Sequence, residues 1–134
     1  MFKQLIGIAA LALSFTAAAQ QPPTVVDLPT RPGVTQRMLV TTPPEPQATV
    51  ILLAGGHGGL QIFQNGSFKW GEGNFLVRSR QLFADKGLMA VVVDAPSDRQ
   101  RAPFLNGFRQ TEEHVADLKA TIAWARATAK VPVW

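Results

Sequence analysis

Ala48-Thr49-Val50-Ile51-Leu52-Leu53-Ala54-Gly55-Gly56-His57-Gly58-Gly59-Leu60 joins an unbroken apolar and β-branched run to four glycines around one histidine. A run without polar alternation is typical of a strand that is buried on both faces. Glycines placed directly after a strand let the backbone turn sharply and leave N–H groups that no side chain covers. Such groups stabilise negative charge, either on a phosphate or on an oxyanion that develops during a reaction.

Two shorter strands are predicted before this stretch. Thr24–Leu28 and Gln36–Thr41 are rich in apolar and β-branched residues, and the turn between them contains two prolines and a glycine. This arrangement favours an antiparallel hairpin. The prolines of residues 43–46 cannot donate ladder hydrogen bonds, so they separate the hairpin from the buried strand.

A helix and a second buried strand are predicted after the glycines and an irregular loop, Gln61–Gly73. Asn74 suits the N-cap of a helix that runs to Lys86, and Gly87 suits its C-cap. Helical spacing predicts a buried face made of Phe75, Ser79, Leu82 and Phe83. Leu88–Val93 is the second apolar run, so strand, helix and strand form a βαβ unit with parallel strands.

A longer helix and a third strand complete the chain. Ser97–Phe108 is a polar loop, after which Thr111 can cap a helix that begins with two glutamates, a favourable charge at the start of a helix. Its predicted buried stripe is Val115, Leu118, Ile122 and Ala125. Lys130–Trp134 predicts the start of a third parallel strand. The predicted fold class is therefore α/β, a mostly parallel sheet with an N-terminal antiparallel hairpin.

Residues 1–19 are predicted to be a bacterial signal peptide, and residues 20–134 a single partial domain. Lys3 precedes a short apolar run, Leu5–Phe15, and Ala17-Ala18-Ala19 fits an A-x-A cleavage site. The apolar run is shorter than the roughly 20 residues that span a membrane. We therefore expect a periplasmic or secreted protein without a stable membrane anchor.

Composition excludes several classes of function. The chain contains no cysteine, so disulfides, thiolate metal sites and cysteine nucleophiles are excluded. The formal net charge of +4 comes from scattered basic residues rather than from a basic stripe, so nucleic-acid binding is not expected. The sequence does not indicate the oligomeric state.

The order of these parts resembles the first half of an α/β-hydrolase of the serine esterase and lipase type. His57-Gly58-Gly59 is similar to the H-G-G oxyanion signature of that family, and it follows the corresponding strand. The resemblance implies that the N–H groups of Gly58 and Gly59 point at the carbonyl oxygen under attack, while His57 braces the loop. It implies hydrolysis of a small ester, amide or similar carbonyl substrate without a metal or an organic cofactor.

The sequence departs from the family in having no G-x-S-x-G nucleophile elbow, which should follow the third strand. His114 is predicted to be a solvated surface residue, and Asp94 does not occupy the position of the triad acid. The serines that lie outside an elbow context include Ser67, Ser79 and Ser97. We expect these 134 residues to be an N-terminal fragment that is marginally stable, inactive alone, and truncated before a triad that follows Trp134.

Two other functions stay open at this point. An exported, non-catalytic α/β binding module would use the loop aromatics Phe63, Phe68 and Trp70 as a contact surface, although the same residues could line a substrate pocket or simply cover the core. A dinucleotide-binding domain would begin its G-x-G-x-x-G motif at Gly56. That motif is incomplete, because its sixth position is Gln61 and the expected acid about 20 residues further on is missing.

Overall fold

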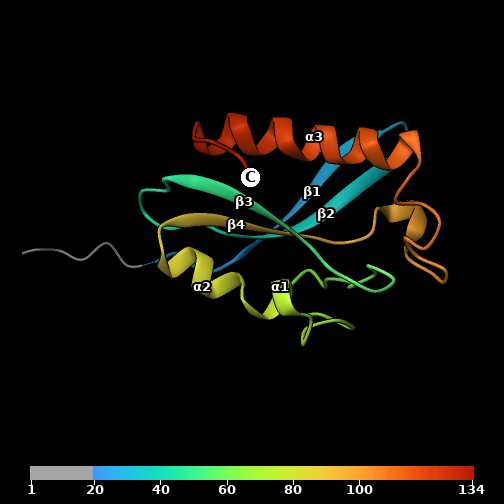
Figure 1. Ribbon diagram of the computed structural model, residues 1–134, viewed down its shortest axis with the longest axis horizontal. Helices are drawn as coiled ribbons and strands as arrows, with labels where there is room; N and C mark the ends of the chain where they lie inside the picture. The colour runs from blue at the N-terminus through green and yellow to red at the C-terminus, as the bar shows by residue number, and fades with distance from the viewer. Residues whose placement is uncertain (1–19) are drawn as a thin grey trace, which may run out of the picture.

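A four-stranded mixed sheet organises residues 20–134, the part of the chain that the computed structural model describes (Figure 1). The strands are β1 (Thr24–Arg31), β2 (Val34–Thr41), β3 (Ala48–Leu53) and β4 (Leu88–Val93), in the spatial order β1-β2-β4-β3. β2 pairs antiparallel with β1 and β4, whereas β3 and β4 are parallel. The predicted α/β class, hairpin and parallel pair are thereby confirmed. The prediction of a mostly parallel sheet was wrong for the described strands, because β2 inserts between β1 and β4 and pairs antiparallel with both. The predicted signal peptide, Met1–Ala19, lies outside the described residues.

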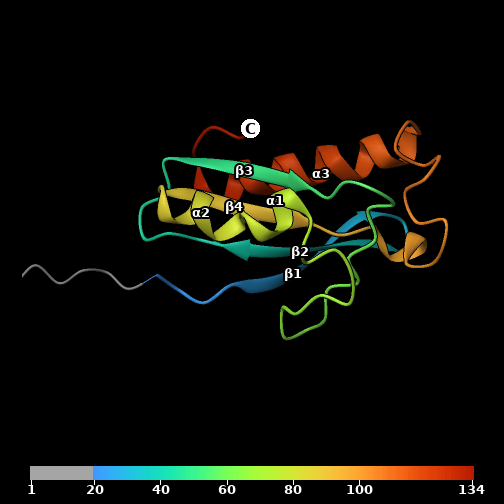
Figure 2. The same cartoon turned by 60° about the horizontal axis from the view of Figure 1, so that its bottom comes forward.

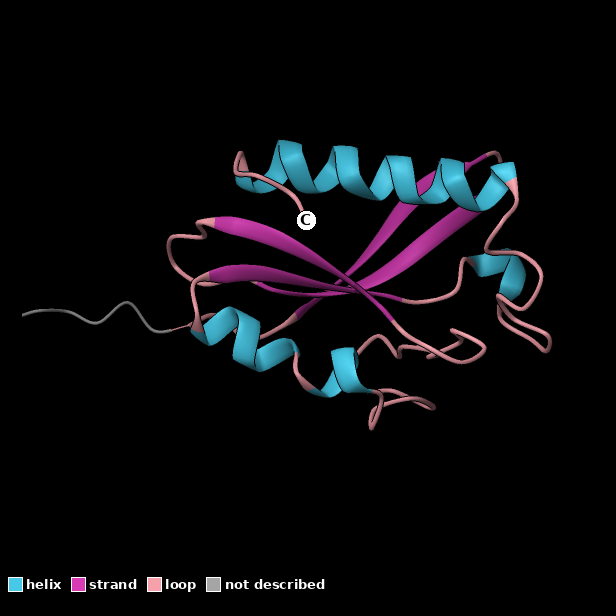
Figure 3. Cartoon of the chain, in the orientation of Figure 1, coloured by secondary structure: helices cyan, strands magenta, loops and turns pink. Residues whose placement is uncertain are grey.

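Helices cover both faces of this sheet (Figures 1 and 3). They are α1 (Phe75–Arg78), α2 (Arg80–Asp85) and α3 (Glu112–Ala129), and a short 3-10 helix, η1, spans Ser97–Arg99. Alternate residues of β4 face opposite layers, because successive strand side chains point to opposite faces. Met89 and Val91 pack in the core under α3, whereas Ala90 and Val92 pack in the core beneath α1 and α2.

The helix predicted from Asn74 to Lys86 is two short helices that meet at Ser79, so that prediction was wrong in part (Figure 2). At the junction the carbonyl oxygen of Val77 accepts a 2.7 Å hydrogen bond from the Arg80 guanidinium. The break changes which side chains are buried. Phe75 and Leu82 are each 66% exposed, and the buried residues are Val77 and Ala84.

α3 and its Thr111 cap are confirmed, but most of its predicted buried stripe was wrong. The buried residues are His114, Asp117, Thr121 and Ala125, and only the last was predicted. Polar side chains turn toward the sheet because Asp117 meets an arginine partner from β1 there. Of the predicted stripe, Val115 is 44% exposed, and the two central residues line a groove beside β3. This edge groove is lined by Ile51, Leu53, Leu118, Ile122, Arg126, Val133 and Trp134.

The predicted third strand is present as a short parallel pairing on the outer edge of β3. The N–H of Thr49 donates to the Pro132 carbonyl at 2.8 Å, and that of Ile51 donates to the Trp134 carbonyl at 2.9 Å. Trp134 returns a 2.8 Å bond to the Thr49 carbonyl. β3 thus has neighbours on both sides along its first half, while Leu53 at its end is 43% exposed.

Candidate functional site

The glycine loop, residues 55–60, leaves β3 at the carboxyl edge of the sheet. Gly56 and Gly58 have φ values of 65° and 74°, a left-handed conformation that favours glycine. Within residues 20–134, the N–H groups of residues 55–58 form no hydrogen bond. The loop residues line a cavity of about 120 Å³ together with Ala54, Gly71 and Asn74. No acidic side chain lines this cavity.

His57 is bonded back onto its own loop. Its Nδ1 accepts a 3.0 Å hydrogen bond from the Gly59 N–H, which fixes the tight turn between them. Its ring stacks on Phe104 at 4.4 Å between centroids, and its carbonyl accepts a 2.9 Å bond from the Leu105 N–H. Of the two predicted oxyanion donors, the Gly58 N–H is therefore free of protein acceptors among the described residues, whereas that of Gly59 is bonded to the histidine.

Asp94 holds the far end of the glycine loop. Its Oδ1 accepts hydrogen bonds from the N–H groups of Leu60 at 2.8 Å and Gln61 at 3.1 Å, and its Oδ2 accepts from Ile62 at 2.9 Å. The residue is 2% exposed, and its carboxylate also accepts from the Ala95 N–H at 2.7 Å. Hydrogen bonds to a charged acceptor are stronger than neutral ones, so this residue determines the position of the loop.

The sequence contained a signal for this contact, although the role of Asp94 was not predicted. The residue follows β4 directly, and β4 is the parallel neighbour of β3. Because the carboxyl ends of parallel strands meet at one edge of a sheet, a polar residue there faces the loop that leaves β3.

A covering segment, residues 97–111, packs over the glycines. A Cβ atom placed on Gly58 would lie 2.5 Å from Leu105 Cδ1, and one on Gly59 would lie 2.2 Å from Phe104 Cδ1. Real Cβ atoms are not found so close to a neighbour, and protein interiors are packed too densely to absorb such an overlap. A side chain at either position would therefore have to displace Leu105 or Phe104 from the loop.

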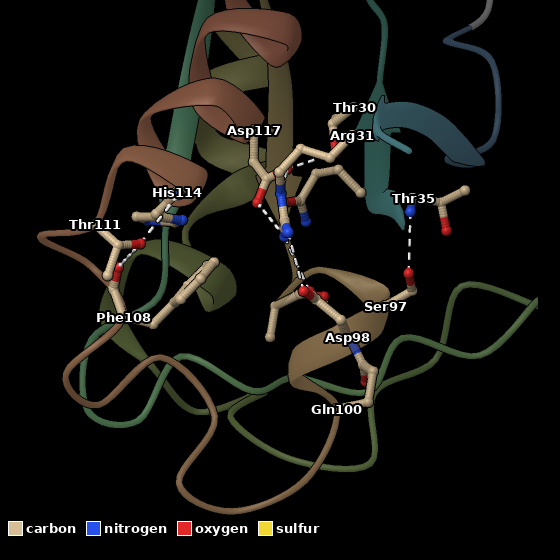
Figure 4. Close-up of polar contacts among 12 residues, drawn as sticks. Thr30, Arg31, Thr35, Ser97, Asp98, Gln100, Phe108, Thr111, His114 and Asp117 are labelled. Carbon is tan, nitrogen blue, oxygen red and sulfur yellow. Dashed lines mark hydrogen bonds and ion pairs between the residues drawn. The ribbon is translucent and has the colours of Figure 1, made fainter. Parts of the chain in front are cut away.

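An arginine at the end of β1 fastens this covering segment to the sheet and to α3 (Figure 4). The Arg31 guanidinium donates to both carboxylate oxygens of Asp117, at 2.9 and 3.0 Å, and to both of Asp98, at 3.0 Å. Asp117 is fully buried and also accepts from the Thr30 hydroxyl, whereas the Asp98 side chain is 35% exposed. These carboxylates keep the pKa of Arg31 above its ordinary value.

His114 is buried beside this cluster, so the prediction of a solvated surface residue was wrong. It is 6% exposed, and its ring lies 5.4 Å from that of Phe108, centroid to centroid. Its Nδ1 has no partner among the described residues. Burial lowers the pKa of His114, and the nearby charges of Arg109 and Arg31 act in the same direction, against the opposing charge of Asp117. The sequence did not reveal this because the histidine is covered by side chains outside its own helix.

The other residues considered in the sequence have local roles. Ser97 accepts a hydrogen bond from the Thr35 N–H, and Ser67 donates to the Asn65 side chain. Ser79 is the junction of α1 and α2. Of the loop aromatics, Phe68 packs against the core, whereas Phe63 and Trp70 are each 50% exposed.

Comparison with protein-family models and with curated protein sequences finds no match to this chain. In the described part, no group of three or more His, Asp or Glu side chains is arranged to hold a metal ion. No helix formed by residues 20–134 combines the length and the apolar character that crossing a bilayer requires. The geometry of the glycine loop is therefore the main guide to function.

Replacing Asp94 should loosen the glycine loop. In Asp94→Asn an NH2 group replaces one carboxylate oxygen. This NH2 group either faces the Ile62 N–H, so that two donors meet, or takes the place of the oxygen that accepts from Leu60 and Gln61. We expect the free energy of unfolding to fall by about 2 kcal/mol, measured by urea denaturation, with faster hydrogen exchange at residues 60–62. The exposed Asp85→Asn is the control; equal losses in both variants would contradict this role.

Replacing the two carboxylates that bind Arg31 should have unequal effects. Asp117→Ala leaves a mostly buried guanidinium without its inner partner and should lower the free energy of unfolding by about 3 kcal/mol. Asp98→Ala removes the more exposed partner and should cost about 1 kcal/mol or less. Urea denaturation of both variants provides the comparison, and a larger loss in Asp98→Ala would show that the inner ion pair is not the main anchor.

Acidification should destabilise the protein through His114. Its pKa is lower in the folded than in the unfolded chain, so the unfolded state binds the proton more readily. The free energy of unfolding should therefore fall as the pH drops through about 6.5. The lowered pKa values of Asp27 and Asp98 remove stability only below about pH 4. His114→Gln should flatten the dependence between pH 7 and 5; an unchanged slope would refute the assignment.

Proposed function

We propose that residues 20–134 are the oxyanion-stabilising half of an exported, serine-type α/β-hydrolase that acts on a small ester, amide or similar carbonyl substrate. The observation that supports this most directly is the row of N–H groups at residues 55–58, held without acceptors from the described chain at the carboxyl edge of the sheet. The order of hairpin, buried strand, glycine loop, helix, strand, long helix and further strand supports it as well.

In the proposed reaction the Gly58 N–H donates to the carbonyl oxygen as it gains negative charge. A donor fixed before the reaction stabilises the transition state by about 2.7–4 kcal/mol. Fixation comes from the left-handed turn at Gly58 and from the hydrogen bonds of Asp94 to the end of the loop. The Gly59 N–H would join as a second donor only when the His57 ring turns away from it.

The proposed nucleophile is a serine that follows the strand beginning near Val133. Trp134 pairs with β3 in parallel, so a continuation of that strand would end at the same edge of the sheet as the glycine loop. The family resemblance places the nucleophile elbow at that point. A serine there would face the N–H groups across the space where a substrate carbonyl would lie.

A non-catalytic binding module is the second candidate, and the exposed loop aromatics favour it. Phe63 and Trp70 are each half exposed beside Lys69, whose ammonium lies 5.6 Å from the Trp70 ring centroid. Exposed aromatic side chains of this kind are frequent at binding surfaces. Turnover separates the two candidates, because a binding module would bind without hydrolysing an ester.

The test begins with the coding DNA beyond Trp134 and with the protein that it encodes, assayed on 4-nitrophenyl butyrate. Gly56→Ala places a Cβ at a φ of 65°, where no neighbour obstructs it, so its strain should rotate the N–H groups of the loop. We expect kcat to fall by about 100-fold, as on loss of one oxyanion donor. Gly33→Ala, with a φ of 71° and equally open space in the hairpin turn, should leave kcat unchanged.

A stop codon directly after Trp134, or a complete protein without esterase activity, would remove the support for the hydrolase and favour the binding module. Equal kcat losses in Gly56→Ala and Gly33→Ala would mean that general destabilisation, rather than the loop, controls the rate.

A further inference from the structure

We infer that Arg109 selects substrates with a second, anionic group, most simply a carboxylate close to the carbonyl that the glycine loop would bind. The inference rests on the proposed function, because it names the class of substrate for the same site. It makes Arg109 a specificity-determining residue rather than a part of the oxyanion donors.

Arg109 is fixed directly beside the glycine loop. Its Nη2 donates a 3.2 Å hydrogen bond to the Ala54 carbonyl, at the end of β3. The same nitrogen lies 2.8 Å from the position that a Cβ on Gly58 would occupy. Its backbone is held in the covering segment, since its N–H donates to Leu105 at 3.3 Å and Phe108 before it is buried. The guanidinium therefore stands next to Gly58.

The charge of Arg109 is unpaired within residues 20–134. By contrast, two arginines of the hairpin are bonded to carboxylates. Arg31 binds Asp117 and Asp98, and Arg37 binds Asp27. Arg109 forms no ion pair in this part of the chain, and the carbonyl of Ala54 engages one of its five N–H donors.

The neighbouring groups reinforce the preference for an anion. Arg109 does not line the loop cavity itself, but it is bonded to Ala54, which does. Asn74 also lines the cavity, and its amide nitrogen lies 3.3 Å from the position of a Cβ on Gly55. No acidic side chain lines the cavity. Arginine binds a carboxylate through two parallel hydrogen bonds, which makes it suited to recognise such a group. A monoester of a small dicarboxylic acid has the required combination, a carbonyl for the loop and a carboxylate for Arg109.

The kinetic test compares two esters of similar length in the full-length protein, mono-4-nitrophenyl succinate and the neutral 4-nitrophenyl butyrate. Arg109→Gln should raise KM for the succinate ester by 10-fold or more while KM and kcat for the butyrate ester change less than twofold. Arg101→Gln, another exposed arginine of the covering segment, is the matched control and should change neither ester. Arg109→Lys keeps the charge and should restore part of the preference.

A binding measurement separates this inference from the hydrolase proposal. Succinate and the uncharged succinamide are titrated into the same protein while the amide NMR signals of residues 55–58 are followed. Signals that shift with succinate alone, and no longer shift in Arg109→Gln, support the anion site even if no ester is hydrolysed. Hydrolysis of the butyrate ester together with equal effects of Arg109→Gln on both esters would overturn the inference while leaving the hydrolase intact. An identical response to succinate in Arg109→Gln would overturn it as well.

Discussion

The Asp94 carboxylate joins the ends of two parallel strands into one site, and the geometry of the glycine loop depends on it. A loop with several glycines loses much conformational freedom on folding and has few side chains with which to hold itself in place. Here one buried carboxylate accepts hydrogen bonds from the N–H groups of three successive residues, Leu60, Gln61 and Ile62. These bonds fix the point at which the loop ends. With that end fixed and β3 fixing the other, the intervening N–H groups stay aligned without partners of their own in the described chain. The conformation of the loop is thus a consequence of how the loop ends.

The sequence predicted the features that depend on residues nearby in the chain. It did not predict the features that depend on contacts between residues far apart in the chain. The buried strands, the hairpin and the cap of α3 follow from local periodicity and from capping chemistry. The buried side of α3 does not, because Asp117 turns inward to reach Arg31, which lies 86 positions earlier. Apolar periodicity cannot detect a polar anchor, so the predicted stripe was displaced toward the edge groove. In the candidate site, the glycine loop and His57 could be predicted from the sequence, whereas the contacts of Asp94 and Arg109 required the parallel register and the covering segment.

The arginines of this molecule differ in the groups that hold them. Arg31 and Arg37 are held by bidentate contacts with carboxylates, and such geometry makes an ion pair contribute to stability. Arg109 instead donates a hydrogen bond to a backbone carbonyl. This bond positions the guanidinium but leaves its charge without an ion pair within residues 20–134. The difference shows why the net charge of the chain says little about its partners.

The packing around the glycines has a consequence for comparing this protein with relatives. Gly58 and Gly59 are covered by Leu105 and Phe104, so packing alone favours glycine at both positions. Gly55 is under no such constraint, since its φ is not left-handed and an added Cβ would meet only the movable Asn74 amide at 3.3 Å. Persistence of glycine at position 55 across lineages would therefore record selection for access to the backbone N–H groups. Substitution of Gly55 in relatives that keep the other two glycines would indicate that selection acts on the packing of the loop alone.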